Sequence, residues 1–380
     1  MELERRQALA AMLVSALPFP LEAAPLSNNE SDKKTYAAVA LQIAARSIEK
    51  APDRAAARKQ MLAMIPEIGA KLRSSVIFIQ QYGGAPVKLA VLPEYVLTSY
   101  PGRISIPDFA EKAALEVDGP EYEALGKIAQ EQKLFLSGNA YEADKNFPGI
   151  YFQTCFIIGP NGNVVLRYRR LNSMFAPTPH DVWSKYLDFY GLDGVFPVAK
   201  TEIGNLSAIA SEEILYPEIA RAHALRGAEI FVHNSSEIGS PIATPKMIAK
   251  RARAFENMAY VISANTAGIL DTGIPVGGPD GNSMVVDWKG NVLSESNSGE
   301  TFTAFADVDI AALRAARRKP GMTNMLARQR NALFAAAYGT DSHQQANGLI
   351  DGGAVKVPDR DYFVRTMEAT IERLAKDGLI

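Results

Sequence analysis

Ser211 is the residue of this chain that its sequence context best places for chemistry. The apolar run Leu206–Ala210 predicts a buried strand that ends just before it. A helix at Glu218–Leu225 and a second apolar strand at Glu229–His233 follow. This order predicts a right-handed crossover between two parallel strands. Ser211 and His233 are therefore expected near the carboxyl edge of a sheet, where open α/β folds bind their ligands.

A serine beside a histidine could act as the nucleophile of an acyl-transfer reaction, because a serine hydroxyl normally needs a histidine base. Glu94 follows another short apolar strand, Val87–Leu92, and could add a carboxylate. Geometry defines such a triad, so two interpretations stay open from the sequence. Either Ser211 and His233 form a catalytic pair, or His233 only makes hydrogen bonds at its strand end.

The remaining segments predict strands and helices in alternation around this unit. Further strands are expected at 36–43, 134–141, 151–158, 163–169, 260–264 and 283–287, and helices at 55–74, 121–132, 245–257 and 361–376. A loop rich in proline and aromatic residues is expected at 171–194. Gly162-Asn163-Val164 and Gly290-Asn291-Val292 are similar hairpin turns, which indicates two similar layers.

Composition excludes several classes of protein. Of 380 residues, 47% are hydrophobic and 22% charged, which is typical of a globular protein with a large core. Forty basic and 42 acidic residues give a formal charge of −2, so no nucleic-acid partner is expected. The single cysteine, Cys155, excludes an internal disulfide, and the four histidines lack metal-ligand spacing. No metal or other cofactor is expected.

The amino-terminal segment, residues 1–34, is expected to be an export signal or a flexible extension. Arg5 and Arg6 precede an apolar run at 8–21 and then small residues, a pattern similar to a twin-arginine signal. The alternative is an amphipathic helix that packs on the protein. The location would be periplasmic in the first case and cytoplasmic in the second. Because the run is short and contains prolines, no membrane span is expected.

Four motifs in order resemble the carbon–nitrogen hydrolase superfamily, which contains nitrilases and amidases. They are LPEY at Leu92–Tyr95, RYRR at Arg167–Arg170, the turn Ser211–Glu218, and RAFENMAYVISANTAG at Arg253–Gly268. The resemblance implies an α/β fold, a four-layer α-β-β-α sandwich, that forms a homodimer or a larger homo-oligomer. It implies a hydrolase domain at 35–310. Beyond it, the sequence pattern predicts a carboxyl-terminal helical extension at 311–380, which is expected to make oligomer contacts.

The resemblance also implies roles for individual residues. Family members use a cysteine nucleophile, a glutamate base and a lysine that stabilises the intermediate. Glu94 matches the base, Ser211 stands at the cysteine position and Arg170 at the lysine position. In the amidase branch a second glutamate would fall near Thr178. Of these positions, only Glu94 keeps the family residue.

These departures change the expected chemistry. A lone carboxylate is poorly matched to a serine hydroxyl, which is a far weaker acid than a thiol. Arg170 cannot pass on a proton as lysine can, and is instead expected to pair with Glu94. Tyr95, Thr178 and His233 are predicted to contact a small amide, nitrile or carboxylate ligand. A further carboxylate in the turn, at position 213, is expected to bind backbone amides.

Three functions are therefore kept open. The first is a protein of this superfamily with a degenerate site that binds, but does not hydrolyse, small amides or nitriles. The second is an active amide or ester hydrolase that uses Ser211 with Glu94 or His233. The third is a non-catalytic assembly subunit that uses the family dimer surface and the carboxyl-terminal extension.

Overall fold

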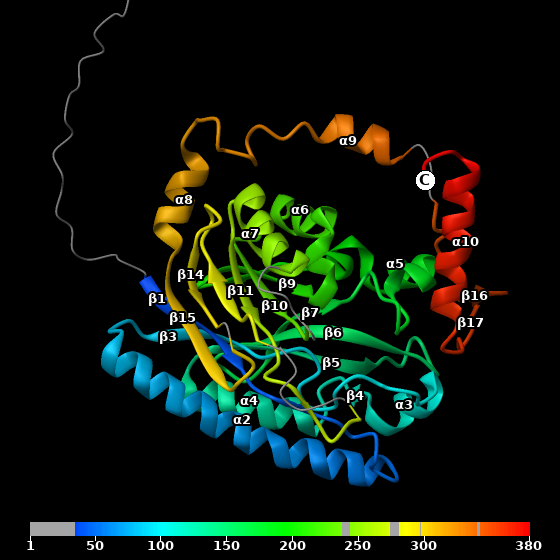
Figure 1. The fold of residues 1–380 in the computed structure, drawn as a ribbon, viewed down its shortest axis with the longest axis horizontal. Helices are drawn as coiled ribbons and strands as arrows, with labels where there is room; N and C mark the ends of the chain where they lie inside the picture. The colour runs from blue at the N-terminus through cyan, green and yellow to red at the C-terminus, as the bar shows by residue number, and fades with distance from the viewer. Residues whose placement is uncertain (1–34, 238–243, 274–280, 297, 340–342) are drawn as a thin grey trace, which may run out of the picture. The chain divides into compact units, whose positions relative to one another are not determined.

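A computed structural model of the chain describes residues 35–237, 244–273, 281–296, 298–339 and 343–380. Two β-sheets form its centre (Figure 1). The first has the order β15-β1-β3-β5-β6-β7, with β4 paired to β5, and the second has the order β14-β13-β11-β10-β9-β8. The first sheet consists of β1 (Thr35–Gln42), β3 (Val87–Val91), β4 (Leu115–Glu116), β5 (Phe135–Ala143), β6 (Tyr151–Ile158), β7 (Val164–Arg169) and β15 (Phe302–Asp309). The second consists of β8 (Ala199–Thr201), β9 (Gly204–Ala210), β10 (Ile230–Asn234), β11 (Tyr260–Ala264), β13 (Met284–Val286) and β14 (Val292–Glu295).

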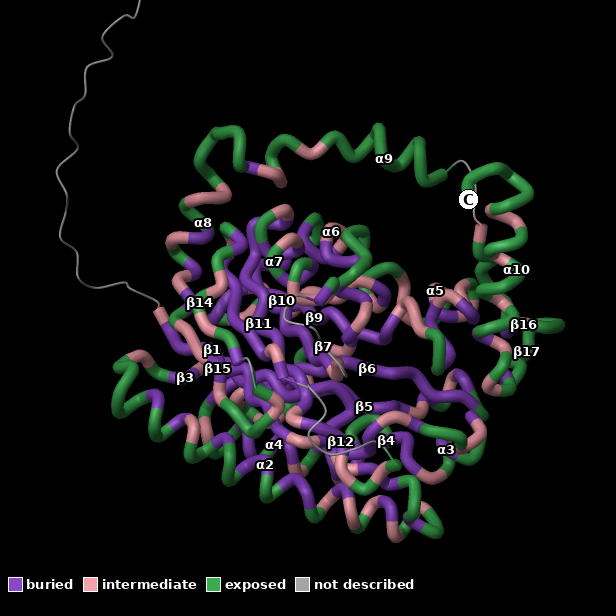
Figure 2. The backbone as a smooth tube through the Cα atoms, in the orientation of Figure 1, coloured by how far each residue is buried: buried purple, intermediate pink, exposed green. Residues whose placement is uncertain are grey.

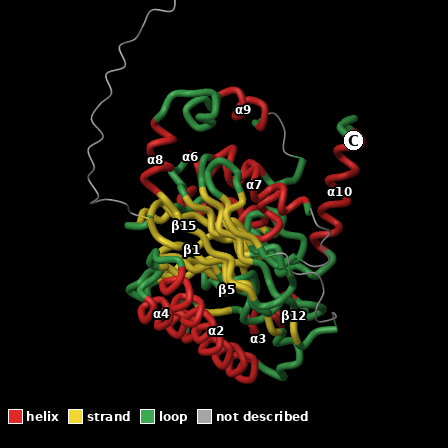
Figure 3. Tube along the Cα trace, turned by 60° about the vertical axis from the view of Figure 1, so that its left-hand side comes forward, coloured by secondary structure: helices red, strands yellow, loops and turns green. Residues whose placement is uncertain are grey.

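Helices cover the outer face of each sheet, as Figures 1 and 3 show. The first sheet carries α2 (Arg54–Tyr82), α3 (Ile106–Ala113) and α4 (Pro120–Gln132), and the second carries α6 (Pro217–Leu225) and α7 (Pro245–Asn257). Between the sheets, Val91 of β3 and Val232 of β10 belong to one fully buried apolar cluster. Figure 2 shows the strands buried and the outer helix faces exposed. The predicted four-layer α-β-β-α sandwich is confirmed.

The predicted crossover around Ser211 is also confirmed. Strands β9 and β10 are parallel, with His233 opposite Ile209, and β10 is in turn parallel to β11. The turns that follow β9 and β10 therefore lie at the same edge. The strand-end segment after β3 joins them from the first sheet, because the Glu94 N–H donates to the Ser235 carbonyl oxygen at 3.2 Å.

The segment expected as a loop at 171–194 is partly helical, so that prediction was wrong. It contains the 3₁₀ turn η1 (Pro179–Val182) and the helix α5 (Trp183–Val195). Thr178 and Asp181 form a capping box that starts η1, a signal in the sequence that the prolines and aromatics obscured. The predicted helix at 55–74 is also longer, because α2 continues through Pro66 to Tyr82.

The carboxyl-terminal part packs along the sandwich in several short elements. They are α8 (Ile310–Arg318), α9 (Asn331–Tyr338), β16 (Ile350–Asp351), β17 (Ala354–Val355) and α10 (Tyr362–Lys376). Elsewhere in the chain, β2 (Ala45–Arg46) and β12 (Ile269–Leu270) form a separate parallel pair. Leu313 lies in the cluster between the sheets, whereas Leu349 and Phe363 belong to the cluster under α2. In contrast, α9 has no buried residue.

Two further expectations concern the amino-terminal segment and membrane-spanning helices. The export signal or flexible segment expected at residues 1–34 lies outside the described residues. Within the described ranges, every helix is too short or too polar to cross a bilayer.

Candidate active site

The turn after β9 holds Ser211 in an unusual backbone conformation. Its φ is 46°, in the left-handed region that non-glycine residues seldom occupy, and its side chain is buried. Glu213 fixes this turn by accepting hydrogen bonds from the backbone N–H groups of Leu171, Asn172 and Ala210. The expectation that Glu213 binds backbone amides is therefore confirmed.

Glu213 also accepts a hydrogen bond from the Tyr168 hydroxyl at 2.7 Å. Complete burial raises the pKa of Glu213 to about 7, and the Arg170 charge and these donors oppose the rise. With donors on both of its oxygens, the side chain is arranged as an ionised carboxylate. It anchors the Ser211 turn to the end of β7.

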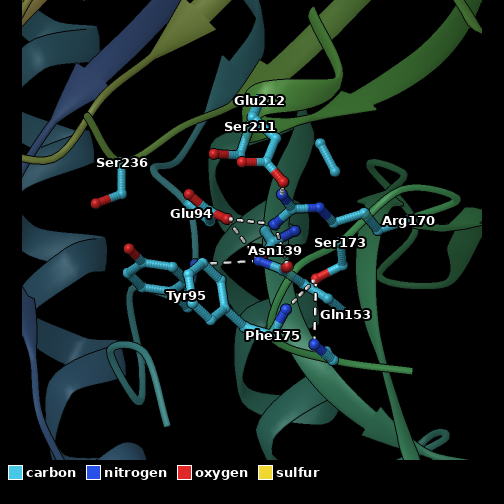
Figure 4. Close-up of polar contacts among 12 residues, drawn as sticks. Glu94, Tyr95, Asn139, Gln153, Arg170, Ser173, Phe175, Ser211, Glu212 and Ser236 are labelled. Carbon is cyan, nitrogen blue, oxygen red and sulfur yellow. Dashed lines mark hydrogen bonds and ion pairs between the residues drawn. The ribbon is translucent and has the colours of Figure 1, made fainter. Parts of the chain in front are cut away.

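Glu94 lies opposite this turn and is almost fully buried (Figure 4). The Gln153 side-chain amide donates to Glu94 Oε1 at 2.6 Å. Burial raises the pKa of Glu94 above its ordinary value, while Arg170, Lys246 and the Ser211 hydroxyl, in decreasing order, favour the ionised form. Glu94 and Ser211 are thus neighbours, as the sequence motifs suggested.

All three guanidinium nitrogens of Arg170 face acceptors of the protein. Its Nη1 donates to Gln153 Oε1 at 2.7 Å and lies 3.4 Å from Glu94 Oε1. Its Nη2 pairs with Glu212, and its Nε donates to the Asn172 carbonyl oxygen at 2.7 Å. Burial lowers the pKa of Arg170, but the Glu212 and Glu94 carboxylates outweigh burial and raise it. The expected pair of Glu94 with Arg170 is confirmed, and Figure 4 shows it.

His233 does not reach the Ser211 hydroxyl, so a Ser211–His233 catalytic pair is not formed. Its Nε2 lies 2.8 Å from the Ser211 backbone carbonyl oxygen, which can only accept, so Nε2 carries the proton. Its Nδ1 then accepts from the Ser263 hydroxyl at 2.8 Å. Burial lowers the pKa of His233 well below its ordinary value. The neutral ring supports the strained turn, which matches the simpler interpretation of a hydrogen-bonded strand-end residue.

Thr178 caps a helix instead of joining this network. Both its backbone N–H and its hydroxyl donate to Asp181 Oδ2, at 2.8 and 2.7 Å. Thr178 lines a cavity of about 310 Å³ that also borders Asn172 and extends to α10. In the described part of the chain, no hydrogen bond joins Thr178 to Glu94, Arg170 or Ser211.

Tyr95 lies beside Glu94 and is buried. Its backbone N–H donates to Asn139 Oδ1 at 3.2 Å, and its ring stacks against Tyr141 with centroids 6.3 Å apart. Figure 4 places the Tyr95 ring next to Glu94. Its contact with a ligand stays a prediction.

Four residues of the site were missed from the sequence: Asn139, Gln153, Glu212 and Lys246. Asn139 and Gln153 lie inside strands, where alternation alone does not separate site residues from core. Glu212 directly follows Ser211, and its position in the turn was an available signal. Lys246, in the first turn of α7, places its Nζ 3.3 Å from Ser211 Oγ. Only the folded crossover brings Lys246 and Ser211 together, 35 residues apart in the chain.

The described residues contain no group of three or more His, Cys, Asp or Glu side chains arranged to hold a metal ion. A sequence profile described as Carbon-nitrogen hydrolase matches residues 35–318. The chain belongs to the carbon–nitrogen hydrolase family.

Relatives of known name agree with this family. Omega-amidase NIT2 of Mus musculus is 25% identical over 228 residues, which are 60% of this chain and 79% of the mouse protein. Omega-amidase NIT2 of Homo sapiens is 24% identical over 242 residues, or 64% of this chain and 84% of the human one.

Solved structures show the same fold. The carbon–nitrogen hydrolase of Helicobacter pylori G27 matches with a TM-score of 0.57 and 22% identity, over 81% of this chain and 99% of that one. The amidase of Nesterenkonia sp. AN1, solved in complex with acrylamide, matches with a TM-score of 0.55 and 18% identity, over 80% and 97%.

The amidase of Nesterenkonia sp. AN1 has an active-site cysteine to which an acetamide moiety was covalently added. The present chain has a single cysteine, Cys155, and this residue is fully buried in β6. Burial raises the pKa of its thiol, which disfavours a reactive thiolate. As expected from the sequence, Cys155 is a core residue.

Proposed function

We propose that this protein binds a small amide, nitrile or carboxylate at Ser211 and does not carry out cysteine-dependent hydrolysis of carbon–nitrogen bonds. The observation that carries the proposal is the engagement of Arg170 with Glu94, Gln153 and Glu212. Arg170 opposes the rise in the pKa of Glu94 that burial causes, which makes Glu94 a poorer proton acceptor than an unpaired buried carboxylate. A guanidinium also cannot pass on a proton. The names of the relatives, which are amidases, support a small amide as ligand class.

Replacement of single residues tests this proposal. The wild type and Ser211→Cys are expected to release no ammonia from acetamide or propionamide above the rate without protein. Arg170 would remain locked to the carboxylates in Ser211→Cys, so a thiol alone does not rebuild the site. Ser211→Cys combined with Arg170→Lys is the matched variant in which both departures are reverted. Rapid ammonia release by the wild type or by Ser211→Cys alone would refute the proposal.

A second candidate is a serine-dependent hydrolase in which Glu94 is the base. It is favoured by the interaction of the Ser211 hydroxyl with Glu94, whose raised pKa would suit proton transfer. In that reaction Ser211 Oγ would bond to the substrate carbonyl carbon while Glu94 takes the hydroxyl proton and returns it to the leaving group. Water would then cleave the acyl–serine bond.

A fluorophosphonate probe separates the two candidates, because it forms a covalent bond only with an activated serine. Under the first proposal Ser211 stays unlabelled in folded protein. Labelling that disappears in Ser211→Ala and in Glu94→Gln, with mass spectrometry locating the adduct on Ser211, would establish the second candidate.

A further inference from the structure

At the position where relatives are expected to keep a lysine, Arg170 directs most of its N–H donors at acceptors of the protein. Each of its three guanidinium nitrogens faces an acceptor of the protein, and two carboxylates offset its charge. For most of these donors, a ligand would have to compete with Glu94, Gln153 or Glu212. A second cation beside Ser211 would therefore be better placed than Arg170 to face a ligand.

Lys246 is placed to supply that charge. Its Nζ donates to Ser211 Oγ and to the Ser236 carbonyl oxygen, each at 3.3 Å, and its side chain is half-buried. Both partners are neutral and both contacts are long, so the three N–H donors of the ammonium are incompletely used. Among the described residues, no carboxylate oxygen forms an ion pair with Lys246, and Glu94 acts on it only at longer range.

The position of Lys246 is unfavourable for the stability of its own helix. Thr244 caps α7 and Pro245 follows, so Lys246 lies in the first turn, where the helix dipole disfavours cations. One turn further along α7, Lys250 is fully buried and donates to the Asn282 carbonyl oxygen at 2.9 Å. Burial lowers the pKa of Lys250 to about 8; Glu237 opposes this, and the charge of Lys246 adds to it.

A bound anion would relieve these costs together. It would accept a hydrogen bond from the Lys246 ammonium, and one from the Ser211 hydroxyl once that hydroxyl turns away from Glu94. Its charge would offset the two lysines of α7. A carboxylate provides two oxygens at a separation that suits an ammonium and a hydroxyl placed 3.3 Å apart. A neutral amide offers one weaker acceptor oxygen to the same pair.

We infer that Lys246 is the ligand-binding cation of this site and that, with Ser211, it selects small carboxylates over the corresponding amides. This inference rests on the proposed function, because it names the ligand class of the same site. Lys246 thereby places an amine beside Ser211. This amine comes from α7, whereas the position at which relatives are expected to keep a lysine follows β7 and holds Arg170.

Ligand-detected saturation-transfer NMR with the full chain tests this assignment. The probes are acetate and propionate, with acetamide and propionamide as the matched neutral pair. The wild type is expected to bind the carboxylates more tightly than the amides. Lys246→Met is expected to weaken carboxylate binding by about tenfold or more, the effect of losing one charge-assisted hydrogen bond, and to change amide binding little.

Arg251→Met is the matched control, because Arg251 is a cation on the same helix that is exposed and donates instead to the Gly290 carbonyl oxygen. It is expected to leave carboxylate binding unchanged. Lys246→Gln serves as a second variant if Lys246→Met does not fold, as judged by circular dichroism. Lys246→Arg is expected to restore part of the affinity.

The opposite results would refute either the role of Lys246 alone or the proposed function as well. Unchanged carboxylate binding by Lys246→Met or Lys246→Gln would refute the role of Lys246. A wild type that binds the amides but not the carboxylates would also refute it and leave the proposed function standing. A wild type that binds neither pair would refute both.

Discussion

At the scale of single residues, the guanidinium of Arg170 decides the character of the site. An amine at this position would be one movable point charge, whereas the planar guanidinium connects Gln153, Glu94 and Glu212 in a fixed arrangement. The Glu94 carboxylate is thereby bound by other side chains of the protein, Arg170 and Gln153. The ligand-facing charge is left to Lys246, which has only neutral partners among the described residues.

Carboxylate binding is expected to weaken as pH rises. The Glu94 carboxyl faces Arg170, Gln153, Ser211 and Lys246, and burial already raises its pKa. A ligand carboxylate beside it would raise that pKa further, so binding takes up a proton. Affinity should then fall as pH rises from the pKa of the free site towards that of the complex. Titration of acetate over about pH 5 to 8 measures this slope, and Glu94→Gln should flatten it. An equal slope in both proteins would contradict the role given to Glu94.

Glu213→Gln is expected to destabilise the fold. An amide in place of the carboxylate turns one acceptor oxygen into a donor that faces the N–H groups of the turn. Leaving such buried donors without an acceptor costs about 1–3 kcal/mol in the free energy of unfolding, measured by urea denaturation. Glu202→Gln, at an exposed glutamate, is the control and should change it by under about 0.5 kcal/mol. Equal effects would show that Glu213 does not hold the turn.

At the scale of elements, the site is assembled from the ends of strands in both sheets and from the start of α7. β3 leads to Glu94, β7 to Arg170 and β9 to Ser211. His233 then ties β10 to the Ser211 carbonyl oxygen. Each of these side chains therefore follows a strand whose position is set by its pairing within a sheet. The start of α7 is the part that depends on a local cap.

Thr244→Ala is expected to affect both stability and binding. The Thr244 hydroxyl oxygen accepts from the Met247 N–H at 3.1 Å, and loss of such a cap costs about 1 kcal/mol. Fraying of this turn would displace Lys246, so carboxylate affinity should fall too. Asp53→Ala removes the matching cap of α2, where Asp53 accepts from the Ala56 N–H at 2.8 Å. This control should lose comparable stability and keep its affinity. Equal affinities in both variants would indicate that Lys246 does not depend on the cap.

Much of this arrangement could be predicted from the sequence, and the limits have physical causes. Short apolar strands and their turn residues predicted the crossover and the hairpins, whereas the sandwich of two sheets was implied by the family resemblance. Motif order placed Glu94, Arg170 and Ser211 together. The network around them was not predictable, because Gln153 and Asn139 are polar residues within strands and Lys246 is distant in the chain. Which atom of Ser211 faces His233 depends on a backbone torsion that sequence periodicity does not reveal.

At the scale of the whole molecule, the carboxyl-terminal extension is partly integrated and partly exposed. Leu349 and Phe363 pack into the cluster under α2, so removal of residues 339–380 would also disturb the core. In α9, by contrast, Leu333 is 68% and Tyr338 65% exposed. Such an apolar helix is costly in water and suits a contact between copies of the chain. We therefore propose that α9 contributes to a homo-oligomer.

Glutamates introduced together at Leu333 and Phe334 are expected to lower the particle mass towards that of one chain. A charged pair would be buried at the contact, whereas the fold should persist because α9 has no buried residue. Multi-angle light scattering gives the mass, and circular dichroism checks the fold. Phe78→Glu, on the exposed face of α2, is the control. A mass that stays unchanged in the double variant would exclude α9 from the contact.

The pairing of β1 with β15 has a mechanical consequence. The strands are antiparallel over eight residue pairs, and Thr35 lies opposite Asp309. A pulling force applied between these two residues would act across the strands, so the hydrogen bonds of the pair would break one after another instead of all together. The sandwich should therefore yield to modest tension at this seam, even where its resistance to heat is high.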